Sequence, residues 1–326
     1  MTMQAGNWAV VLAAGDGARL SSLTTDEHGD VVPKQFCSLA GGRTLLQDAL
    51  QRAAQIVSRE RLCAIVARRH VRHWRHLLWS LPPRNVIVQP RNCGTANGVL
   101  LSVLHILRRD ALARIIFLPA DHYVQDEALL ADSLRTTGML LTHDREIITL
   151  VGIEPDAVDP ELGYIVPGGW DSHGARRVAR FVEKPSASVA GELIALGAVW
   201  NSFIFGAHAK TLLELMHGRL PQIVESMTSA LIRHPKEGER TSALDALYER
   251  LPVLDFSRVI VQGAESAFRV SIAPACGWAD LGTPQRVAQT LQRLHLAPAP
   301  RSRRSALLSP PFVDLSARVE RSENVF

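Results

Sequence analysis

Short apolar segments and amphipathic segments alternate along the first half of the chain. Five segments are apolar and rich in β-branched residues, as strands covered on both faces are, and they span 8–13, 62–66, 86–88, 115–118 and 147–151. Between them, apolar residues recur at helical spacing over 44–58, 70–78, 96–108 and 127–142. This alternation predicts an α/β fold with a Rossmann-like, mostly parallel mixed sheet that is covered by helices on both faces.

The second half of the chain has a more mixed pattern. Strands are predicted over 163–166, 178–182 and 203–205, with a further pair near Val259 and Val270, and helices over 189–196, 209–216, 241–250 and 284–294. After His295 the segment APAPRSRRSALLSPPF alternates proline, serine and arginine with little helical pattern. We therefore expect one domain over 1–295, followed by a flexible or surface-tracking tail over 296–326.

The composition of the 326-residue chain is that of an ordinary globular domain, with 47% hydrophobic and 21% charged residues. No apolar run approaches 18 residues and residues 1–7 carry no basic segment, so neither a transmembrane helix nor a signal peptide is expected. The four cysteines lack zinc-type spacing and any C-x-x-C pair, which favours free thiols in a reducing cytoplasm. Cys93 is expected to be a small buried thiol, because its neighbours include no obvious base.

The charge pattern favours a small anionic substrate over nucleic acid. A net charge of +4 is weak for a chain of this size. A basic run over 68–76 is interleaved with Trp74 and Trp79, an arrangement that can stack nucleic-acid bases. The apolar residues of this run fall at helical spacing, however, so we interpret it as an amphipathic helix with a solvated face. Neither a nucleic-acid nor a membrane partner is predicted.

The segment after the first predicted strand carries the clearest chemical signal. It reads AAGDGARL, and the small residues Ala14, Gly15 and Gly17 let the backbone approach a ligand closely. Successive amides in such a turn bind anions, and Arg19 and Lys34 add positive charge around them. The segment has neither the GK[ST] ending of a P-loop nor G-x-G-x-x-G spacing. Taken alone, the Gly-rich turn could equally be the point where the strand leaves its sheet. Together with the two cations, it has the outline of a triphosphate site.

Two later loops and a distant turn carry further candidate ligands. In QPRNCGTANG, Gly94 and Thr95 lie where a loop enters a predicted helix, whose N-terminus can offer amides to a ligand or simply be capped by Thr95. Asp121 follows a strand in FLPADHYV, and Asp280 lies in GWADLGTP. Two carboxylates suit Mg²⁺, which takes phosphate oxygens and water as its other ligands. The alternatives are a helix cap for Asp121 and a turn residue for Asp280.

In this order the motifs resemble those of the sugar-phosphate nucleotidyltransferases, most closely the bacterial mannose-1-phosphate guanylyltransferases. The resemblance rests first on LAAG-x-G-x-RL followed by PKQF, and it covers roughly residues 8–290. It implies the nucleotide-diphospho-sugar transferase fold, in a short form without the isomerase domain of longer members. It assigns nucleotide binding to Ala13, Ala14, Gly15 and Gly17. It assigns to Arg19 and Lys34 a catalytic role, the binding of phosphates at the reaction centre.

The resemblance assigns the remaining motifs as well. QPRNCGTANG stands where the family has a base-recognition segment close to RNTAP, which gives Gln89, Gly94, Thr95 and Ala96 as nucleotide-binding residues. Asp121 in PADH, and Asp280 in a segment similar to GWSDVGSW, correspond to magnesium ligands. The segments GYIVPG, FVEKP and WNSFIFG resemble the sugar-phosphate pocket and assign to it Gly163, Tyr164, Glu183, Lys184 and Asn201.

We therefore predict a cytoplasmic enzyme that uses Mg²⁺ to transfer a nucleotidyl group from an NTP, GTP in the first place, to mannose-1-phosphate. His122 is expected to orient its neighbours, since this chemistry scarcely needs a base. Base and sugar stay open, because CGTANG departs from the family segment and Ile260 stands where the family's SIDYAVME ends in glutamate. The alternatives are uridylyl or thymidylyl transfer to glucose-1-phosphate and, in another class, a non-catalytic regulatory protein that binds sugar nucleotides. Whether the chain forms a homodimer is left open.

Overall fold

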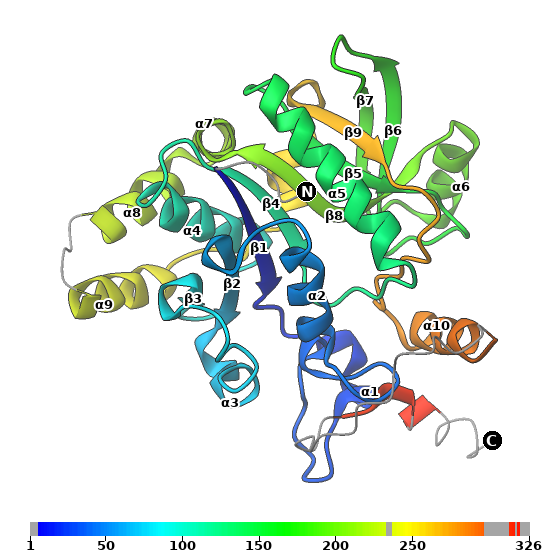
Figure 1. Ribbon diagram of the computed structural model, residues 1–326, viewed down its shortest axis with the longest axis horizontal. Coiled ribbons are helices and arrows are strands. Elements are labelled where there is room, and N and C mark those ends of the chain that lie inside the picture. Colours follow the sequence, from blue (N-terminus) through cyan, green and yellow to red (C-terminus); the bar gives the residue numbers. More distant parts are fainter. Residues whose placement is uncertain (1–5, 233–236, 297–312, 317, 320–326) are drawn as a thin grey trace.

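The computed structural model describes residues 6–232, 237–296, 313–316 and 318–319. Within these residues one mixed sheet has helices on both faces, which confirms the predicted α/β fold (Figure 1). Its strands are β1 (Asn7–Ala13), β2 (Leu62–Ala67), β3 (Val86–Gln89), β4 (Arg114–Pro119), β5 (Ile148–Ile153), β6 (Gly163–Trp170), β7 (Arg176–Glu183), β8 (Val199–His208) and β9 (Phe268–Ile272).

The α-helices are α1 (Ser21–Thr24), α2 (Leu45–Ala54), α3 (Val71–Trp74), α4 (Thr95–Leu107), α5 (Glu127–His143), α6 (Ala187–Ala195), α7 (Ala209–Arg219), α8 (Pro221–Ile232), α9 (Glu237–Tyr248) and α10 (Pro284–Leu296). Short 3-10 segments are η1 (Ala18–Leu20), η2 (Lys34–Phe36), η3 (Arg59–Arg61), η4 (Arg68–His70), η5 (Pro83–Asn85) and η7 (Glu265–Ala267), and η6 (Ser257–Val261) is a π-helical turn. Helix starts follow local chemistry: Thr44 and Gln47 form a capping box before α2, and the Asp126 side chain caps α5.

The first four strands form the parallel part of the sheet, in the order β3-β2-β1-β4. Ala13 at the end of β1 lies opposite Val66 of β2, and Leu12 lies opposite Pro119 of β4. Because parallel strands share one direction, the loops after β1, β3 and β4 all leave from the same edge. This brings the Gly-rich, QPRNCG and PADH segments together.

Beyond β4 the sheet continues as β8-β5-β9-β7-β6, mostly by antiparallel pairing. In the register of β8 against β4, Phe205 lies opposite Phe117. The start of β8, at residues 199–202, therefore extends past the carboxyl end of β4. This crossing brings residues from the second half of the chain to the loops of the first half.

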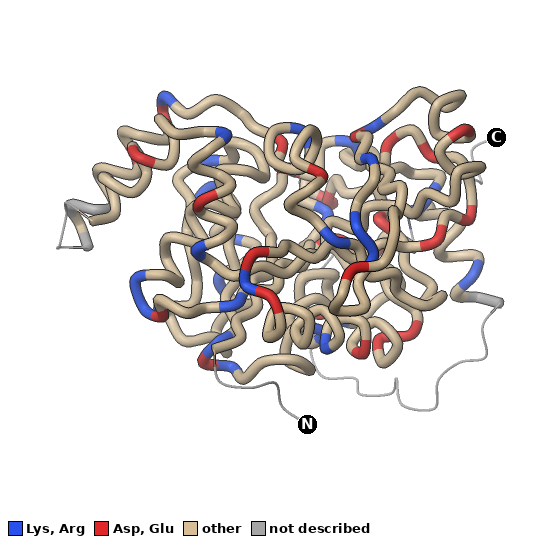
Figure 2. The backbone as a smooth tube through the Cα atoms, turned by 90° about the horizontal axis from the view of Figure 1, so that it is seen from above, with Lys and Arg blue, Asp and Glu red and all other residues tan. Residues whose placement is uncertain are grey.

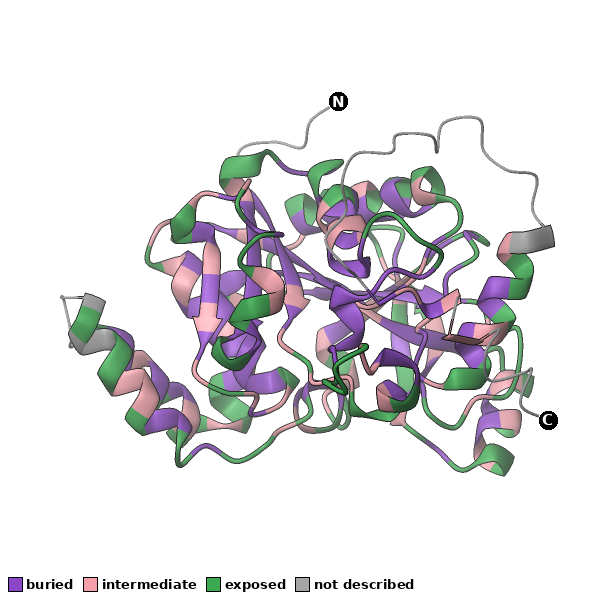
Figure 3. Ribbon diagram, turned by 90° about the horizontal axis from the view of Figure 1, so that it is seen from below, coloured by how far each residue is buried: buried purple, intermediate pink, exposed green. Residues whose placement is uncertain are grey.

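Alternate side chains of each central strand pack into cores on opposite faces of the sheet. In β1, Val11 belongs to the core that also contains α2, α5 and α6, whereas Val10 belongs to the core that contains α4, α7 and α8. Figure 3 shows the strands buried between helices whose outer faces are exposed. Both faces being covered explains the nearly continuous apolar sequence of the strands.

Two predicted elements are wrong and one helix was missed. The helix expected over 70–78 shrinks to α3, with η4 before it and turns after it. The strand expected near Val259 is the π-helical turn η6. Helix α8 was not predicted, although its sequence PQIVESMTSALI has helical spacing and a proline in its first turn. In the 70–78 segment, arginine and histidine side chains crowd a short apolar stripe, and only one turn of helix is stabilised by packing.

Charges of both signs are interspersed along the whole backbone (Figure 2). In the basic run after β2, three arginines form ion pairs with carboxylates from other segments: Arg68 with Asp245, Arg69 with Asp16 and Arg72 with Asp30. The four cysteines are buried and free, as predicted. The Cys93 thiol donates to the Tyr248 carbonyl oxygen at 3.6 Å.

A short piece near the C-terminus packs beside η2. The Ser38 amide donates to the Val313 carbonyl oxygen, and the Leu315 amide donates to the Ser38 carbonyl oxygen, each at 3.0 Å. The Leu315 side chain is fully buried. Most of the expected tail, at 297–312, 317 and 320–326, lies outside the described residues, and the domain boundary at 295 stays a prediction.

Candidate active site

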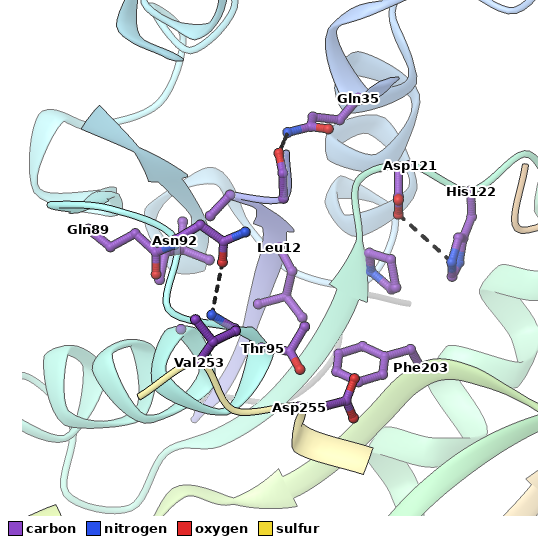
Figure 4. A pocket seen from close by; sticks show the side chains of 16 residues that line it. Leu12, Gln35, Gln89, Asn92, Thr95, Asp121, His122, Phe203, Val253 and Asp255 are labelled. Atoms are coloured by element: carbon purple, nitrogen blue, oxygen red, sulfur yellow. Dashed lines mark hydrogen bonds and ion pairs between the residues drawn. The ribbon is translucent and has the colours of Figure 1, made fainter. Parts of the chain in front are cut away.

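A pocket of about 370 Å³ lies at the carboxyl edge of the parallel strands (Figure 4). The loops after β1, β3 and β4 form most of its wall, and the start of β8 and the segment 253–255 complete it. The wall residues are Leu12, Ala14, Gly15, Gln35, Ile65, Gln89, Asn92, Gly94, Thr95, Gly98, Pro119, Asp121, His122, Phe203, Val253 and Asp255. Five of the predicted nucleotide-binding residues are among them, whereas Ala13, Gly17 and Ala96 are not.

The Gly-rich loop is held in place by the segment that carries Lys34. The side-chain amide of Gln35 donates to the carbonyl oxygens of Ala13 and Gly15, at 3.0 and 2.7 Å. Gly17 has a φ of 64°, and a Cβ there would lie 2.8 Å from the Lys34 amide nitrogen. Gly17 therefore serves the contact between the two segments. Gly15 is the position that leaves open space for a ligand, since a Cβ there would meet no heavy atom within 4 Å.

The N-terminus of α4 is less free than the sequence suggests. The Ala96 amide donates to the Leu254 carbonyl oxygen at 3.0 Å, and the Thr95 hydroxyl oxygen accepts from the Phe256 amide at 2.8 Å. Gly94, at φ 86°, permits this docking, because a Cβ there would lie 2.2 Å from the same Leu254 oxygen. The Ala96 amide is thus committed to the protein. The docked segment, residues 253–255, also places Val253 in the pocket wall.

Gln89 is the polar side chain of this pocket with unused hydrogen-bonding capacity. It is almost completely buried, and its Oε1 has no hydrogen-bond partner in the protein. It packs against α4 at Gly98, where a Cβ would lie 3.4 Å from that oxygen. A buried amide oxygen without a partner is costly, so this position is suited to hydrogen bonding with a ligand.

Lys34 ties together the loops that carry the two predicted metal ligands. Its ammonium lies 3.1 Å from Oδ2 of Asp121 and donates to the carbonyl oxygens of Asp280 and Leu281, at 2.6 and 3.1 Å. The residue is only 5% exposed, and these three contacts account for all three N–H groups of the ammonium. Lys34 therefore supplies charge from a fixed position, and it would have to exchange a partner to bind a phosphate oxygen directly.

The two aspartates differ in how their charge is balanced. Burial raises the pKa of Asp280, and Lys34 offsets that effect only in part. For Asp121, burial also acts to raise the pKa, but the positive charge of Lys34 and the hydrogen bonds to the carboxylate together outweigh it, and the pKa lies below its usual value. Oδ1 of Asp280 is buried and has no hydrogen-bond partner. This unused carboxylate oxygen belongs to a residue that lines the same pocket as Asp121, and it fits a bound cation.

His122 and Trp278 form a buried pair beside these aspartates. The indole N–H of Trp278 donates to Nδ1 of His122 at 3.2 Å, and Nε2 of His122 lies 3.8 Å from Oδ1 of Asp121 (Figure 4). Burial lowers the pKa of His122 to about 3, so the imidazole is neutral. Both ring nitrogens of this neutral imidazole face protein groups, Nδ1 the indole and Nε2 the Asp121 carboxylate.

A second, smaller pocket of about 160 Å³ adjoins the first. The two share Asp121, His122 and Phe203. The wall residues of the second pocket are Arg19, Lys34, Asp121, His122, Glu161, Leu162, Gly163, Glu183, Asn201, Ser202, Phe203, Ser257, Trp278 and Asp280. Three predicted sugar-phosphate residues, Gly163, Glu183 and Asn201, lie in this wall.

Tyr164 and Lys184 do not lie in the wall of either pocket. Tyr164 is fully buried, and its hydroxyl donates to the Asp159 carbonyl oxygen at 3.1 Å, so it fixes the loop before β6. Glu183 points into the pocket with its Oε2 buried and unpartnered. Burial and the negative charge of Asp255 raise the pKa of Glu183 to about 7. Gly163 makes room for this carboxylate, since a Cβ there would lie 2.5 Å from Oε2.

Glu161 joins two predicted phosphate-binding cations. Its Oε2 lies 2.7 Å from the Arg19 guanidinium and 4.0 Å from the Lys184 ammonium. The backbone of Glu161 is fixed, because its amide donates to Oδ1 of Asp159 at 2.9 Å, and Asp159 in turn accepts from Arg286. An anionic group thus already lies between Arg19 and Lys184.

Backbone strain is concentrated at these pockets. Among the described non-glycine residues, positive φ values occur at Lys184 (50°), Phe203 (56°) and Leu281 (52°). Each adjoins the site: Phe203 divides the two pockets, and the others directly follow Glu183 and Asp280. Such conformations cost about 1–3 kcal/mol each and persist where the surrounding structure imposes them.

Comparison with known proteins identifies the family. The family model described as Nucleotidyl transferase matches residues 8–295. The chain belongs to the nucleotidyl transferase family. A solved structure from Thermus thermophilus, described as a mannose-1-phosphate geranyltransferase, is 30% identical with a TM-score of 0.74, and the match covers 88% of this chain and 79% of that one.

Curated relatives of this nucleotidyl transferase include proteins named as a mannose-1-phosphate guanylyltransferase and as an alginate biosynthesis protein. The mannose-1-phosphate guanylyltransferase RfbM of Salmonella typhimurium is 28% identical over 288 residues, and the alginate biosynthesis protein AlgA of Pseudomonas aeruginosa is 27% identical over 281 residues. Each match covers 84% of this chain and 56% of the relative. The chain therefore spans little more than half the length of the curated relatives it matches.

Members of the family generally use a divalent metal. In the described part of the chain, no group of three or more His, Cys, Asp or Glu side chains is placed to hold one. A two-carboxylate centre is compatible with Mg²⁺, because substrate phosphates and water complete its coordination. None of the helices within the described ranges has the length and hydrophobicity needed to cross a bilayer.

Sequence reasoning missed several wall residues of this nucleotidyl transferase, namely Gln35, Asn92, Glu161, Phe203, Val253 and Trp278. All but Val253 lie inside or next to a motif that was recognised, so proximity to PKQF, QPRNCG, GYIVPG, WNSFIFG and GWADLGTP was an available signal. The concern about Ile260 has a structural answer. Ile260 is fully buried in the apolar core of the α4 face and lines neither pocket.

Proposed function

We propose that this nucleotidyl transferase transfers a nucleotidyl group from a nucleoside triphosphate, GTP in the first place, to mannose-1-phosphate, forming a nucleotide sugar and pyrophosphate. The observation that carries the proposal is the pair of adjoining pockets that share Asp121. The larger combines apolar and glycine wall residues with polar side chains that include Gln89, Asn92 and Asp255, and it suits a base and ribose. The smaller is lined by charged and amide side chains and suits a sugar phosphate.

The reaction needs no covalent protein intermediate. A phosphate oxygen of the sugar-1-phosphate attacks the α-phosphorus of the triphosphate in line, the bond to the β-phosphate oxygen breaks, and pyrophosphate leaves with the electron pair. The protein contributes positioning and charge neutralisation. Arg19, whose side chain is half exposed, would contact phosphate directly, whereas Lys34 would neutralise charge from its fixed position between the aspartate loops.

Asp121 and Asp280 would hold the Mg²⁺ ion. The metal supplies charge neutralisation on the phosphates and favours their alignment for displacement. The unpartnered Oδ1 of Asp280 and the raised pKa of its carboxyl support this assignment, because a bound cation would satisfy the oxygen and stabilise the ionised form.

The choice of guanine and mannose is supported by similarity to proteins named for that activity. Within the chain, Gln89 is suited to the base, since a side-chain amide can pair with the donor and acceptor edge of a purine. Glu183 and Asn201 are suited to the sugar hydroxyls. Activated mannose would feed polysaccharide synthesis, as the alginate and xanthan names of several relatives suggest.

A substrate matrix tests the proposal. Purified full-length protein with Mg²⁺ would be given four nucleoside triphosphates against mannose-1-phosphate, glucose-1-phosphate and galactose-1-phosphate, with pyrophosphate release as the readout. We expect the highest kcat/KM for GTP with mannose-1-phosphate. A preference for UTP or dTTP with glucose-1-phosphate would keep the reaction and correct the substrates. Nucleotide-sugar binding without pyrophosphate release from any pair would support the non-catalytic alternative instead.

A further inference from the structure

We infer that His122 is a positioning residue that fixes the Asp121 carboxylate and, through Trp278, locks the loop of Asp121 to the loop of Asp280. The part of this inference that concerns the metal rests on the proposed function. The part that concerns the imidazole rests on hydrogen-bond geometry alone.

The protonation of the imidazole follows from its partner. An indole N–H can only donate, so Nδ1 of His122, which lies 3.2 Å from Nε1 of Trp278, must accept and carries no proton. Because the neutral ring has one N–H, the proton resides on Nε2. The rings meet edge to face, with centroids 5.0 Å apart, and both residues are buried. Trp278 thus selects one tautomer.

This tautomer excludes His122 as a general base. A base needs an unprotonated ring nitrogen within reach of the substrate. The unprotonated nitrogen of His122 is Nδ1, and the indole occupies it. The other ring nitrogen, Nε2, carries a proton and faces Asp121. His122 can therefore donate toward the carboxylate but cannot remove a proton from a sugar phosphate.

The two oxygens of Asp121 face different donors. Oδ2 lies 3.1 Å from the Lys34 ammonium, and Oδ1 lies 3.8 Å from Nε2 of His122. The first distance is an ion pair with hydrogen-bond geometry, whereas the second is a charge–dipole contact beyond hydrogen-bond range. Together they restrain rotation of the carboxylate plane from both sides. Outer partners of this kind set the orientation of a metal ligand.

The His122–Trp278 hydrogen bond also connects the loop of Asp121 to the loop of Asp280, and it is one of three such connections. Tyr123 and Ala279 exchange both backbone hydrogen bonds, each at 2.9 Å, in an isolated antiparallel bridge. Each residue is next to one member of the His122–Trp278 pair. Lys34, through the Asp280 carbonyl oxygen, forms the third connection. A shift of either loop is therefore transmitted to the carboxylate on the other.

Trp200 provides a matched control for the indole N–H. It lies in the same aromatic cluster, with its ring centroid 6.3 Å from that of Trp278, and is also buried. Its Nε1, however, has no hydrogen-bond partner. Trp278→Phe and Trp200→Phe therefore remove similar volumes, but only the first removes a hydrogen bond to His122.

The first experiment measures the imidazole itself. Two-bond ¹⁵N–¹H NMR of the full chain without metal or nucleotide, assigned by comparison with His122→Asn, reports which ring nitrogen is protonated. We expect protonated Nε2 and unprotonated Nδ1, with loss of that single tautomer in Trp278→Phe and its retention in Trp200→Phe. A protonated Nδ1 in the unmodified protein, or equal spectra in the two variants, would overturn the inference.

The second experiment measures Mg²⁺ dependence. We expect the Mg²⁺ concentration for half-maximal pyrophosphate release to rise about 10-fold in His122→Asn and several-fold in Trp278→Phe, with Trp200→Phe unchanged. His122→Gln keeps an N–H toward Asp121 but leaves the indole unpaired, whereas His122→Asn does the reverse. Gln should therefore restore the Mg²⁺ dependence, and Asn should restore thermal stability. If His122 had only a structural role, the Mg²⁺ dependence would change in parallel with thermal stability in both variants.

The two proposals fail in different ways. If the unmodified chain releases no pyrophosphate from any substrate pair, the proposed function fails and the NMR experiment still decides the tautomer. If the unmodified chain is active and all four variants keep its Mg²⁺ dependence, the positioning role fails and the proposed function stands.

Discussion

The nucleotide-facing and sugar-facing pockets are built by different interactions. In the first, backbone and amide contacts fix the wall: Gln35 holds the Gly-rich loop, and the Ala96 amide holds the docked segment at Leu254. In the second, charged side chains face each other, with Glu161 against Arg19 and Glu183 left without a partner for its Oε2. The first pocket is thus preorganised, whereas ligand binding in the second must rearrange charges that the protein now pairs internally.

Asp280 lies in the second pocket beside the Asp121 that both pockets share, and its replacement should have the largest effect. Asp280→Asn keeps the shape but removes the charge that would hold the metal, so we expect kcat to fall by roughly 100- to 1,000-fold. The thermal midpoint should stay the same or rise, because the buried carboxylate has a raised pKa and is costly to ionise. Asp132→Asn, at an exposed position on α5, is the control. Near-normal turnover of Asp280→Asn would mean that Asp280 does not take part in the reaction.

Gln89 tests whether the first pocket reads the base. Gln89→Leu would keep the buried volume and lose the hydrogen-bonding amide. We expect kcat/KM for the preferred nucleotide to fall about 10- to 100-fold, with smaller losses for the other nucleotides, because an unpaired donor or acceptor on the base costs about 1–3 kcal/mol.

The readout is a kinetic comparison of the four nucleoside triphosphates at saturating sugar-1-phosphate. Gln51→Leu on the exposed face of α2 controls for a surface change. The KM for the sugar-1-phosphate should not move in either variant. If Gln89→Leu weakened all four nucleotides equally, the residue would support the pocket without reading the base.

The sequence predicts the first pocket better than the second, because the two pockets are built by different kinds of interaction. The first pocket is formed by loops that follow parallel strands, so strand periodicity and short motifs were enough to identify Gly15, Gln89 and Asp121 in segments that follow predicted strands. The second depends on β8 running antiparallel past β4 and on long-range ion pairs. Neither the position of Phe203 nor the pairing of Glu161 with Arg19 has a local sequence signature.

At the N-terminus of α4, local sequence did not reveal a tertiary contact. Its sequence allowed either free amides for a ligand or a simple cap by Thr95, whereas in the structure tertiary docking of the segment at Leu254 uses the Ala96 amide. Gly94 is required there by the close approach of another backbone segment. A glycine at a strand-to-helix turn therefore indicates close approach without saying what approaches.

Glu183 makes the stability of the second pocket depend on pH. Burial and Asp255 raise its pKa to about 7, from an ordinary value near 4.5. Between these two values the folded chain holds a proton that the unfolded chain has lost, so the contribution of this group to the free energy of unfolding decreases as pH rises through the window.

Glu183→Gln should remove that dependence. By calorimetry, we expect the thermal midpoint of the unmodified protein to fall between pH 5 and pH 8 by a few degrees more than that of the variant. Glu192→Gln, at an exposed position on α6, should behave like the unmodified protein. Equal slopes in all three proteins would mean that Glu183 ionises freely and that the second pocket is better solvated than its geometry implies.

The smallest effect is expected at Glu161, and it has an unusual sign. The ion pair with Arg19 is partly exposed, with side chains 44% and 53% accessible, so it contributes at most about 1 kcal/mol. A phosphate that binds Arg19 and Lys184 must displace this carboxylate. Glu161→Gln should therefore lower the KM for sugar-1-phosphate by about 2- to 5-fold while leaving the KM for the nucleotide unchanged. Glu146→Gln, on the exposed loop before β5, is the control. A raised KM would mean that Glu161 binds the sugar itself, and then the charges of the second pocket would be arranged for the substrate before it arrives, as the backbone contacts of the first pocket are.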